Sequence, residues 1–336
     1  MMKKTDKRNY REEPLNTLEA EIAITALHAT GEYTVLRKLN LERDPRFTQK
    51  KVQNAKIGLC IDTETTGLNH AEDKIIELGI VAFEYDPMTG AIIRITDRYN
   101  GFEDPGSPLP QEIIDITGIT DEMVAGQAFD NDRIRALAEG ASIVIAHNAA
   151  FDRKFVEARY PFFVTIPWAC TVYQLDWNKE RIGSRTLEYL LFKCGGYTIN
   201  AHRALDDAEG VLGLLLGNFP ISETPIFTAL LEKSDEPTSR ICAVGAPYDK
   251  KDILKQRGYR WNDGTGSGCK GWWIDVPQHL ERDEMNYLGN EIYPGGKSRT
   301  FLSGKPYLYT LRFLGLLICG FSFMLFRDGA KLLGLF

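Results

Sequence analysis

Blocks of alternating hydrophobic and polar residues along the first two thirds of the chain predict a mixed α/β domain. Strand patterns occur at residues 56–62, 74–86 and 91–100, and the last two are joined by the turn residues Pro-Met-Thr-Gly, so an antiparallel meander is expected. A fully apolar run at 141–148 predicts a buried strand. A mixed sheet flanked by helices follows from this order of elements. Helices are expected at 111–116, 130–138, 149–160, 184–194 and 203–218.

The same patterns divide the chain into five segments. Residues 1–54 are charged and carry apolar residues at helical spacing, so they predict an N-terminal helical extension. The α/β domain is expected at 55–220, followed by a linker with a short helix at 221–239. Strand, helix, strand, turn and strand patterns predict a small α+β module at 240–293, and 294–336 predict a linker and an apolar tail.

The apolar tail contains an uncharged stretch at residues 313–326. It is shorter than the ~20 residues that a membrane-spanning helix needs. Extending it back to Tyr307 reaches that length only by including Arg312. Membrane association is therefore not expected, although the sequence does not distinguish a tail anchor from a buried or irregular segment.

Composition and charge narrow the function classes. The formal net charge is −6, which argues against a protein that coats DNA through bulk positive charge. The six cysteines include no Cys-x-x-Cys pair, so reduced thiols are expected rather than a disulfide framework or a zinc site. The basic N-terminal stretch lacks the apolar core of a secretory signal, and the expected compartment is the cytoplasm.

Acidic residues follow the first predicted strand, in the segment Ile-Asp-Thr-Glu-Thr-Thr-Gly-Leu. Asp62 and Glu64 are two residues apart, so both project from the same face of a strand. Two acids at the end of an apolar strand are costly to bury, and a divalent metal ion would offset that cost. The alternative is an acidic strand end that leads into a turn at Thr66-Gly67.

Two further segments each have an ordinary structural interpretation when taken alone. Asp152, in Ala-His-Asn-Ala-Ala-Phe-Asp, follows a buried strand and can simply complement a helix dipole. His202 and Asp207, in His-Arg-Ala-Leu-Asp-Asp, are five residues apart and do not share a helix face. They can converge if His202 lies in the loop and Asp207 lies one turn inside the helix. Asp206 should then point about 100° away from Asp207, toward solvent.

The three segments in this order resemble the DEDD exonuclease superfamily, in the histidine-containing (DEDDh) branch typified by the proofreading epsilon subunit of bacterial DNA polymerase III. The resemblance covers residues 56–219, and Ile-Thr-Gly-Ile-Thr-Asp-Glu-Met-Val at 116–124 is similar to a further segment of this family. It implies a ribonuclease H-like fold and a 3′→5′ exonuclease that uses two divalent ions, Mg²⁺ or Mn²⁺.

The resemblance also implies roles for individual residues. Asp62 would bridge both ions, Glu64 and Asp207 would hold the ion that activates water, and Asp152 would serve the second ion. His202 would accept the proton of the attacking water, since the ordinary pKa of an imidazole lies near neutrality. Contacts to the terminal nucleotide are implied for Thr65, Thr66, Leu68, Asn148 and Phe151. The alternative for the first three is a turn whose apolar residue folds back to the core, and Phe151 is more often simply a core residue.

The C-terminal module combines cations with aromatic residues. Seven Lys or Arg residues and three acids occur at residues 240–273, interleaved with tyrosines and tryptophans that can stack on unpaired bases. The alternative is a small domain whose tryptophans form the core and whose lysines lie on a solvated helix face. The aromatic residues are Tyr248, Tyr259, Trp261, Trp272 and Trp273.

The expected activity is metal-dependent removal of nucleotides from a DNA 3′ end, in repair or replication. An RNA-trimming exoribonuclease is an alternative, because the same motifs serve both substrates. An accessory subunit that docks on a DNA polymerase is a third interpretation, although residues 220–239 contain no obvious clamp-binding peptide.

Overall fold

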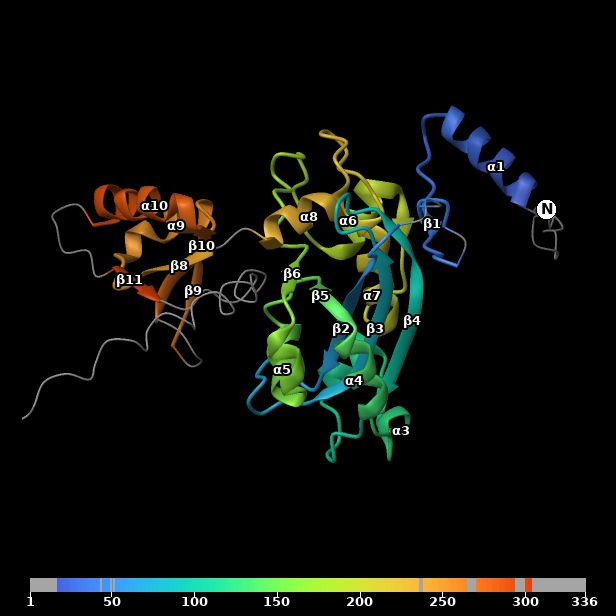
Figure 1. The fold of residues 1–336 in the computed structure, drawn as a ribbon, viewed down its shortest axis with the longest axis horizontal. Helices are drawn as coiled ribbons and strands as arrows, with labels where there is room; N and C mark the ends of the chain where they lie inside the picture. The colour runs from blue at the N-terminus through green and yellow to red at the C-terminus, as the bar shows by residue number, and fades with distance from the viewer. Residues whose placement is uncertain are drawn as a thin grey trace, which may run out of the picture.

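The protein is described by a computed structural model (Figure 1). The apolar tail, with the uncharged stretch at 313–326, lies outside the described residues, so its membrane association stays untested. Among the helices that the structure describes, none has the length and apolar character to cross a bilayer. The described residues are 17–42, 44–48, 50, 52–235, 238–264, 270–293 and 300–303.

A five-stranded mixed sheet is the centre of the larger domain (Figure 1). Its strand order is β4-β3-β2-β5-β6, in which β3 is antiparallel to its neighbours β2 and β4, and β5 and β6 continue the sheet parallel to β2. A meander extended by parallel strands confirms the mixed sheet predicted from the sequence. The bounds are β2 Lys56–Thr65, β3 Ile75–Tyr85, β4 Ile92–Phe102, β5 Ala141–Ala146 and β6 Trp168–Cys170.

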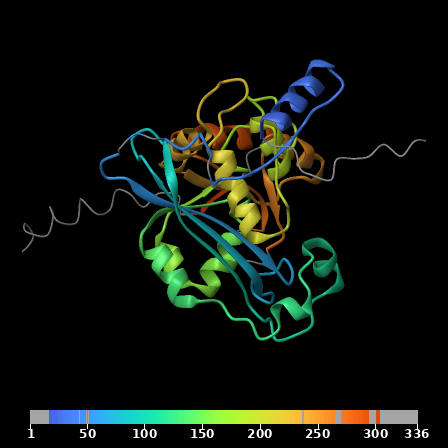
Figure 2. The ribbon, with the colours of Figure 1, turned by 90° about the vertical axis from the view of Figure 1, so that its right-hand side faces the viewer.

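Helices cover both faces of this sheet, as Figure 2 shows with α7 in yellow and α4 and α5 in green on opposite sides. The face bearing Cys60 and Val81 packs against α6, α7 and α8. The face bearing Leu59 and Ile80 packs against α4 and α5. The interior strand β3 is therefore buried on both sides, as expected of a strand covered by helices on each face. The helices are α2 Gln111–Thr117, α3 Asp121–Val124, α4 Asn131–Glu139, α5 Asp152–Arg159, α6 Leu187–Gly195, α7 Ala204–Leu215 and α8 Ile226–Asp235.

The N-terminal extension contains the expected helix, α1 (Thr17–Ala29), and then joins the domain. Strand β1 (Arg37–Lys38) pairs in parallel with β7 (Tyr197–Thr198), and Leu41 is buried in the core beside α7. The guanidinium of Arg46 donates to the carbonyl of Gly213 at 2.9 Å. The chain therefore begins to pack on the domain before residue 55.

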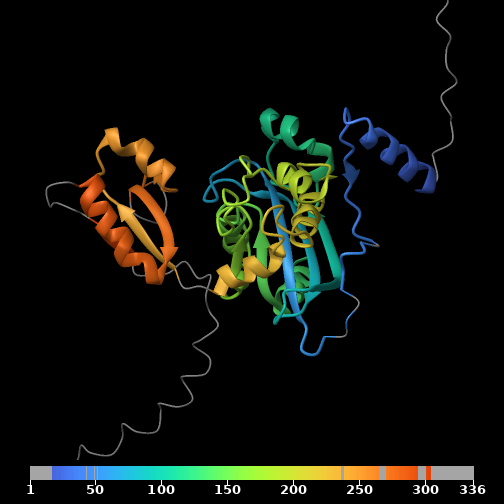
Figure 3. The same ribbon diagram turned by 90° about the horizontal axis from the view of Figure 1, so that it is seen from above.

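The C-terminal module has a four-stranded antiparallel sheet of order β11-β8-β10-β9, with its helices against one face (Figure 3). Strand β11 lies in the stretch 294–336 that was predicted to be a linker and tail. That prediction is wrong at Thr-Phe-Leu-Ser, because this short run pairs with the edge of β8. The elements are β8 Thr238–Ala243, α9 Lys251–Gln256, β9 Arg260–Asn262, β10 Gly271–Pro277, α10 Glu281–Tyr287 and β11 Thr300–Ser303.

The aromatic residues of the module fall into two groups. Trp272 and Tyr259 are buried in its core, as the structural alternative predicted. Trp273 lies between the guanidinium groups of Arg240 and Arg260, at 3.9 and 3.8 Å from its ring centroid. Tyr248 and Trp261 are 80% and 55% exposed and remain candidates for base stacking. The structural alternative is thus confirmed for Trp272 and Tyr259, and base stacking stays a prediction.

The prediction that the cysteines are reduced holds for three residues and is wrong for one. Cys60, Cys170 and Cys194 are free thiols, the first two of them buried. Cys242 on β8 is disulfide-bonded. A disulfide joins residues that are close in space, whatever their separation along the chain, so the absence of a Cys-x-x-Cys pair did not exclude it.

Candidate active site

Strand β2 brings the first two acids to the site. Asp62 and Glu64 lie on the same face near its C-terminal end and are half-buried. Burial raises the pKa of Asp62 well above its usual range, and the nearby carboxylates of Asp152, Asp207 and Glu64 raise it further. Burial, then Asp207, raise the pKa of Glu64 to about 8. The negative charge on each of these two carboxylates is therefore unfavourable unless a cation lies beside it.

Helix α7 completes a cluster of three carboxylates. Asp207 lies in its first turn, and one oxygen of each of Asp62, Glu64 and Asp207 lies within 4.8 Å of the other two. Burial raises the pKa of Asp207 to about 6, although hydrogen bonds from the backbone of His202 and Arg203 oppose that rise. Three hard oxygen donors at this separation suit a divalent cation such as Mg²⁺ or Mn²⁺.

Asp152 lies beside this cluster but does not belong to it. It is the first residue of α5, which follows β5 after a short turn, and it is buried. The backbone N–H and the hydroxyl of Thr63 donate to its Oδ1, at 3.1 and 2.9 Å. Burial raises its pKa to about 7, while Thr63 lowers it. The Asp152 carboxylate is thus bound to Thr63 of β2, and its predicted role at a second ion stays a prediction.

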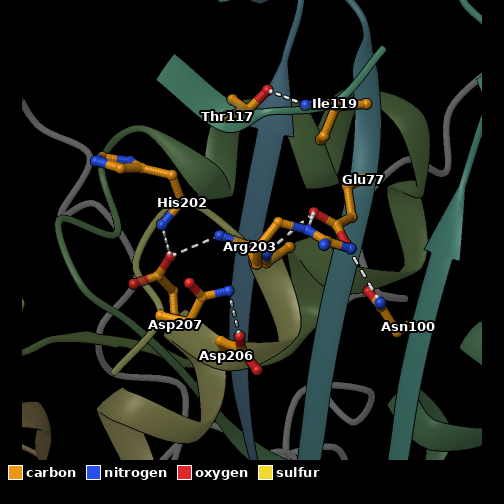
Figure 4. A network of polar contacts seen from close by, with 10 residues as sticks. Glu77, Asn100, Thr117, Ile119, His202, Arg203, Asp206 and Asp207 are labelled. Carbon is orange, nitrogen blue, oxygen red and sulfur yellow. Dashed lines mark hydrogen bonds and ion pairs between the residues drawn. The ribbon is translucent and has the colours of Figure 1, made fainter. Parts of the chain in front are cut away.

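His202 and Asp207 converge through the backbone (Figure 4). Helix α7 begins at Ala204, so His202 lies in the preceding loop and Asp207 one turn inside, as predicted. The backbone N–H of His202 donates to Asp207 Oδ2 at 2.8 Å, and its exposed imidazole points away from that carboxylate. Asp206 instead accepts a hydrogen bond from Asn200 at 3.2 Å and lies outside the carboxylate cluster.

The residues predicted to contact the nucleotide differ in how they are held. Leu68 is 86% exposed, so it does not fold back into the core. The Thr65 hydroxyl donates to the Gly67 carbonyl at 2.6 Å and the Thr66 hydroxyl to Asp73 at 3.1 Å, so both stabilise the loop that carries Leu68. Asn148 and Phe151 occupy the turn after β5, where Asn148 is exposed with φ 65° and Phe151 packs on Phe155 with their ring centroids 5.0 Å apart.

Two site residues were not predicted from the sequence. Glu77 lies on β3 opposite Glu64 and its side chain has no exposed surface. Arg203 forms an ion pair with it, with 2.9 Å between Nη2 and Oε1. The available signal was one acid inside the apolar run Ile-Ile-Glu-Leu-Gly, which is costly to bury without a partner.

His147, by contrast, is a structural histidine. Its two ring nitrogens contact the Thr171 hydroxyl and the Arg185 carbonyl, both at 2.8 Å. Burial lowers its pKa to about 4, so it is neutral at physiological pH. With both nitrogens engaged, it ties the end of β5 to the chain after β6 and is not available as a base.

The fold and the acid cluster agree with the comparison with known families. Residues 59–215 match the family model RNase_T, described as "Exonuclease". The match places an exonuclease-like domain at these residues, which are just under half of the chain.

The curated relatives are DNA polymerases. The "DNA polymerase III PolC-type" of Clostridium perfringens (strain 13 / Type A) is 34% identical over 173 residues, which is 48% of this chain and 11% of the relative. That of Listeria monocytogenes (serovar 1/2a) is 42% identical over 104 residues, 30% of this chain and 7% of the relative. The chain thus spans about a tenth of the length of these relatives.

The comparison with solved structures finds exonucleases at low sequence identity. Exonuclease X in complex with 5′ overhanging duplex DNA is 24% identical, with 51% of this chain and 99% of that chain covered and a TM-score of 0.35. The zinc ion bound form of the E. coli ExoI–ssDNA complex is 16% identical, with 70% and 68% covered and a TM-score of 0.44.

Proposed function

We propose that the chain is a metal-dependent 3′→5′ exonuclease of the DEDDh branch, acting on DNA ends in replication or repair. The observation that carries the proposal is the convergence of Asp62, Glu64 and Asp207 within 4.8 Å. No described cation is paired with these three carboxylates, and burial raises the pKa of each. Such a cluster is stabilised by divalent cations, which the family's hydrolytic chemistry also needs.

The donor set fits Mg²⁺ or Mn²⁺ better than zinc. All candidate ligands are carboxylates, and neither the described free cysteines nor His147 belongs to the cluster. Asp62, Glu64 and Asp207 would hold one ion, and Asp152 with Asp62 a second. Bound there, two ions would stabilise the attacking and leaving oxygens of an in-line displacement at phosphorus.

The remaining residues bind the strand end and move a proton. The exposed Leu68 can pack against the terminal base, and the loop stabilised by Thr65 and Thr66 approaches the 3′ hydroxyl. His202 would accept the proton of the attacking water. Its side chain is exposed, so the imidazole can change rotamer toward the cluster without displacing a packed neighbour.

DNA is the proposed substrate because the curated relatives are DNA polymerases. The same relatives are the reason to propose association with a DNA polymerase. The RNA alternative is decided by the assay below.

The proposal predicts which substrates the purified full chain degrades. End-labelled single-stranded DNA, duplex DNA and RNA should be incubated with Mg²⁺, with Mn²⁺ and with EDTA. We expect stepwise shortening of DNA from the 3′ end with either ion and none in EDTA, since the carboxylates cannot act without a cation. Faster shortening of RNA would select the exoribonuclease alternative, and internal cleavage or activity in EDTA would contradict the proposal.

His202→Ala is expected to lower kcat by about 10²-fold, the usual contribution of a general base. The concentration of Mg²⁺ that gives half-maximal activity should change little, because the exchange leaves the backbone N–H that donates to Asp207. Both are measured in a Mg²⁺ titration at saturating DNA. A weaker Mg²⁺ dependence with unchanged saturated turnover would contradict the base role.

A further inference from the structure

An ion pair with a fully buried carboxylate joins the start of α7 to strand β3 beside the carboxylate cluster (Figure 4). Arg203 Nη2 donates to Glu77 Oε1 at 2.9 Å, and its Nε donates to Oε2 at 3.2 Å. The amide of Asn100 donates to Oε1 at 3.2 Å. Two-pronged Arg–carboxylate bonds fix orientation as well as distance. The Glu77 charge is therefore matched by its own arginine, and Glu77 lies outside the carboxylate cluster.

The same carboxylate also holds the backbone at the helix start. The N–H of Ala204 donates to Glu77 Oε2 at 3.2 Å. The two preceding N–H groups, of His202 and Arg203, donate to Asp207 Oδ2 at 2.8 and 3.2 Å. Three consecutive N–H groups are thus bound by two carboxylates. They belong to the end of the helix where such groups have no partner within the helix.

The backbone at His202 adopts a conformation that needs this support. Its φ is +64°, which is uncommon for a residue with a side chain and persists only where the surroundings hold it. Helix α7 also approaches β3 closely at this point. A Cβ on Gly79 would meet the backbone of Ala204, so only glycine fits there. The helix start is therefore fixed by packing at Gly79 and by the ion pair at Glu77.

We propose that the Glu77–Arg203 ion pair is a positioning device for His202, and this inference rests on the proposed function. The pair fixes the left-handed turn from which the His202 side chain projects, so the imidazole samples positions near the attacking water. Asp207 is held by the body of α7. Loss of the ion pair therefore lowers turnover and leaves the binding of DNA and Mg²⁺ nearly unchanged.

Glu77→Gln and Arg203→Lys test the device with small changes of shape. Each keeps a hydrogen-bonding group and removes the charged two-pronged bond. We expect kcat to fall about tenfold, with KM and the half-saturating Mg²⁺ concentration changed by less than about threefold. Glu84→Gln is the matched control. Glu84 forms an exposed two-pronged bond with Arg94, which joins β3 to β4 far from His202 in the sequence. Removing this bond should change kcat by less than about twofold.

A double variant separates positioning from general structural support. If Glu77 acts through His202, adding Glu77→Gln to His202→Ala should lower kcat by less than about twofold further. A further tenfold loss in the double variant would overturn the inference while leaving the exonuclease assignment intact. Equal losses of kcat in Glu77→Gln and Glu84→Gln would also overturn the inference.

A measurement that does not depend on exonuclease activity completes the test. Amide hydrogen exchange in EDTA should be about tenfold faster at residues 202–204 in Glu77→Gln than in the wild type, and unchanged at Val211 within the same helix. Unchanged exchange at 202–204 would overturn the inference. If the wild-type chain degrades no nucleic acid, the proposed function fails, and the exchange data still decide whether the ion pair holds this turn.

Discussion

Replacing Asp207 by asparagine is expected to lower exonuclease turnover by at least about 10³-fold. A bound divalent ion contributes several kcal/mol of charge stabilisation in the transition state, and each tenfold in rate corresponds to about 1.4 kcal/mol. The asparagine carbonyl can still accept the N–H groups of His202 and Arg203, so the turn before α7 should persist. Turnover is measured on end-labelled DNA at saturating substrate, over a range of Mg²⁺ concentrations.

The adjacent acid provides the matched control. Asp206 lies on the same helix turn, outside the cluster, and accepts a hydrogen bond from Asn200. Asp206→Asn should therefore keep turnover within about threefold of the wild type, as for a surface change. Comparable losses in the two variants would indicate damage to the helix start, and unchanged Mg²⁺-dependent digestion by Asp207→Asn would refute the assignment of the site.

The parts of the fold predicted from the sequence are those with long, regular patterns. Strands β2 to β5 have six residues or more each, and alternation or continuous apolar character identifies them. Strand β6 was missed because three residues, Trp168–Cys170, are too short to show a period. Strands β1, β7 and β11 were missed for the same reason. Each forms because a partner strand offers an edge, which is a tertiary effect.

The site was predictable only where its residues occur in recognisable segments. Asp62, Glu64 and Asp207 come together as predicted, because the strand period and the helix start fix their directions. Glu77 was missed because its partner Arg203 is 126 residues away, so the sequence shows a lone acid in an apolar strand. The orientation of the His202 imidazole was not predictable either, since a backbone bond rather than its ring joins it to Asp207.

The stability of the metal-free protein is expected to fall with rising pH because of the acid cluster. The folded-state pKa values of Glu64, Asp152 and Asp207 are raised to about 8, 7 and 6. The folded state thus binds more protons than the unfolded state above pH 4, and stability is lost as pH rises through these values toward 8. His147, whose pKa is lowered to about 4, acts in the opposite direction below pH 6.5.

Comparing Asp207→Asn with the wild type in EDTA cancels the contribution of His147. Raising the pH from 5 through the Asp207 pKa of about 6 spans one pH unit, and the wild type loses about 1.4 kcal/mol of unfolding free energy. The variant lacks the Asp207 charge, so the reduced repulsion on Asp62 and Glu64 adds to the difference. The free energy of unfolding of the variant, relative to wild type, should thus rise by at least about 1 kcal/mol between pH 5 and pH 8. Urea denaturation at both pH values measures it.

At pH 8, Mg²⁺ should reverse the difference in unfolding free energy between Asp207→Asn and the wild type. Bound ions stabilise the folded wild type according to their affinity, about 2.7 kcal/mol at a hundredfold excess over the dissociation constant. Asp207→Asn, lacking one ligand, should gain less. At pH 5 protons compete for the same carboxylates, so Mg²⁺ should have little effect on either protein. Equal Mg²⁺ stabilisation of wild type and variant at pH 8 would show that the ion binds elsewhere, and the three carboxylates would then need another partner.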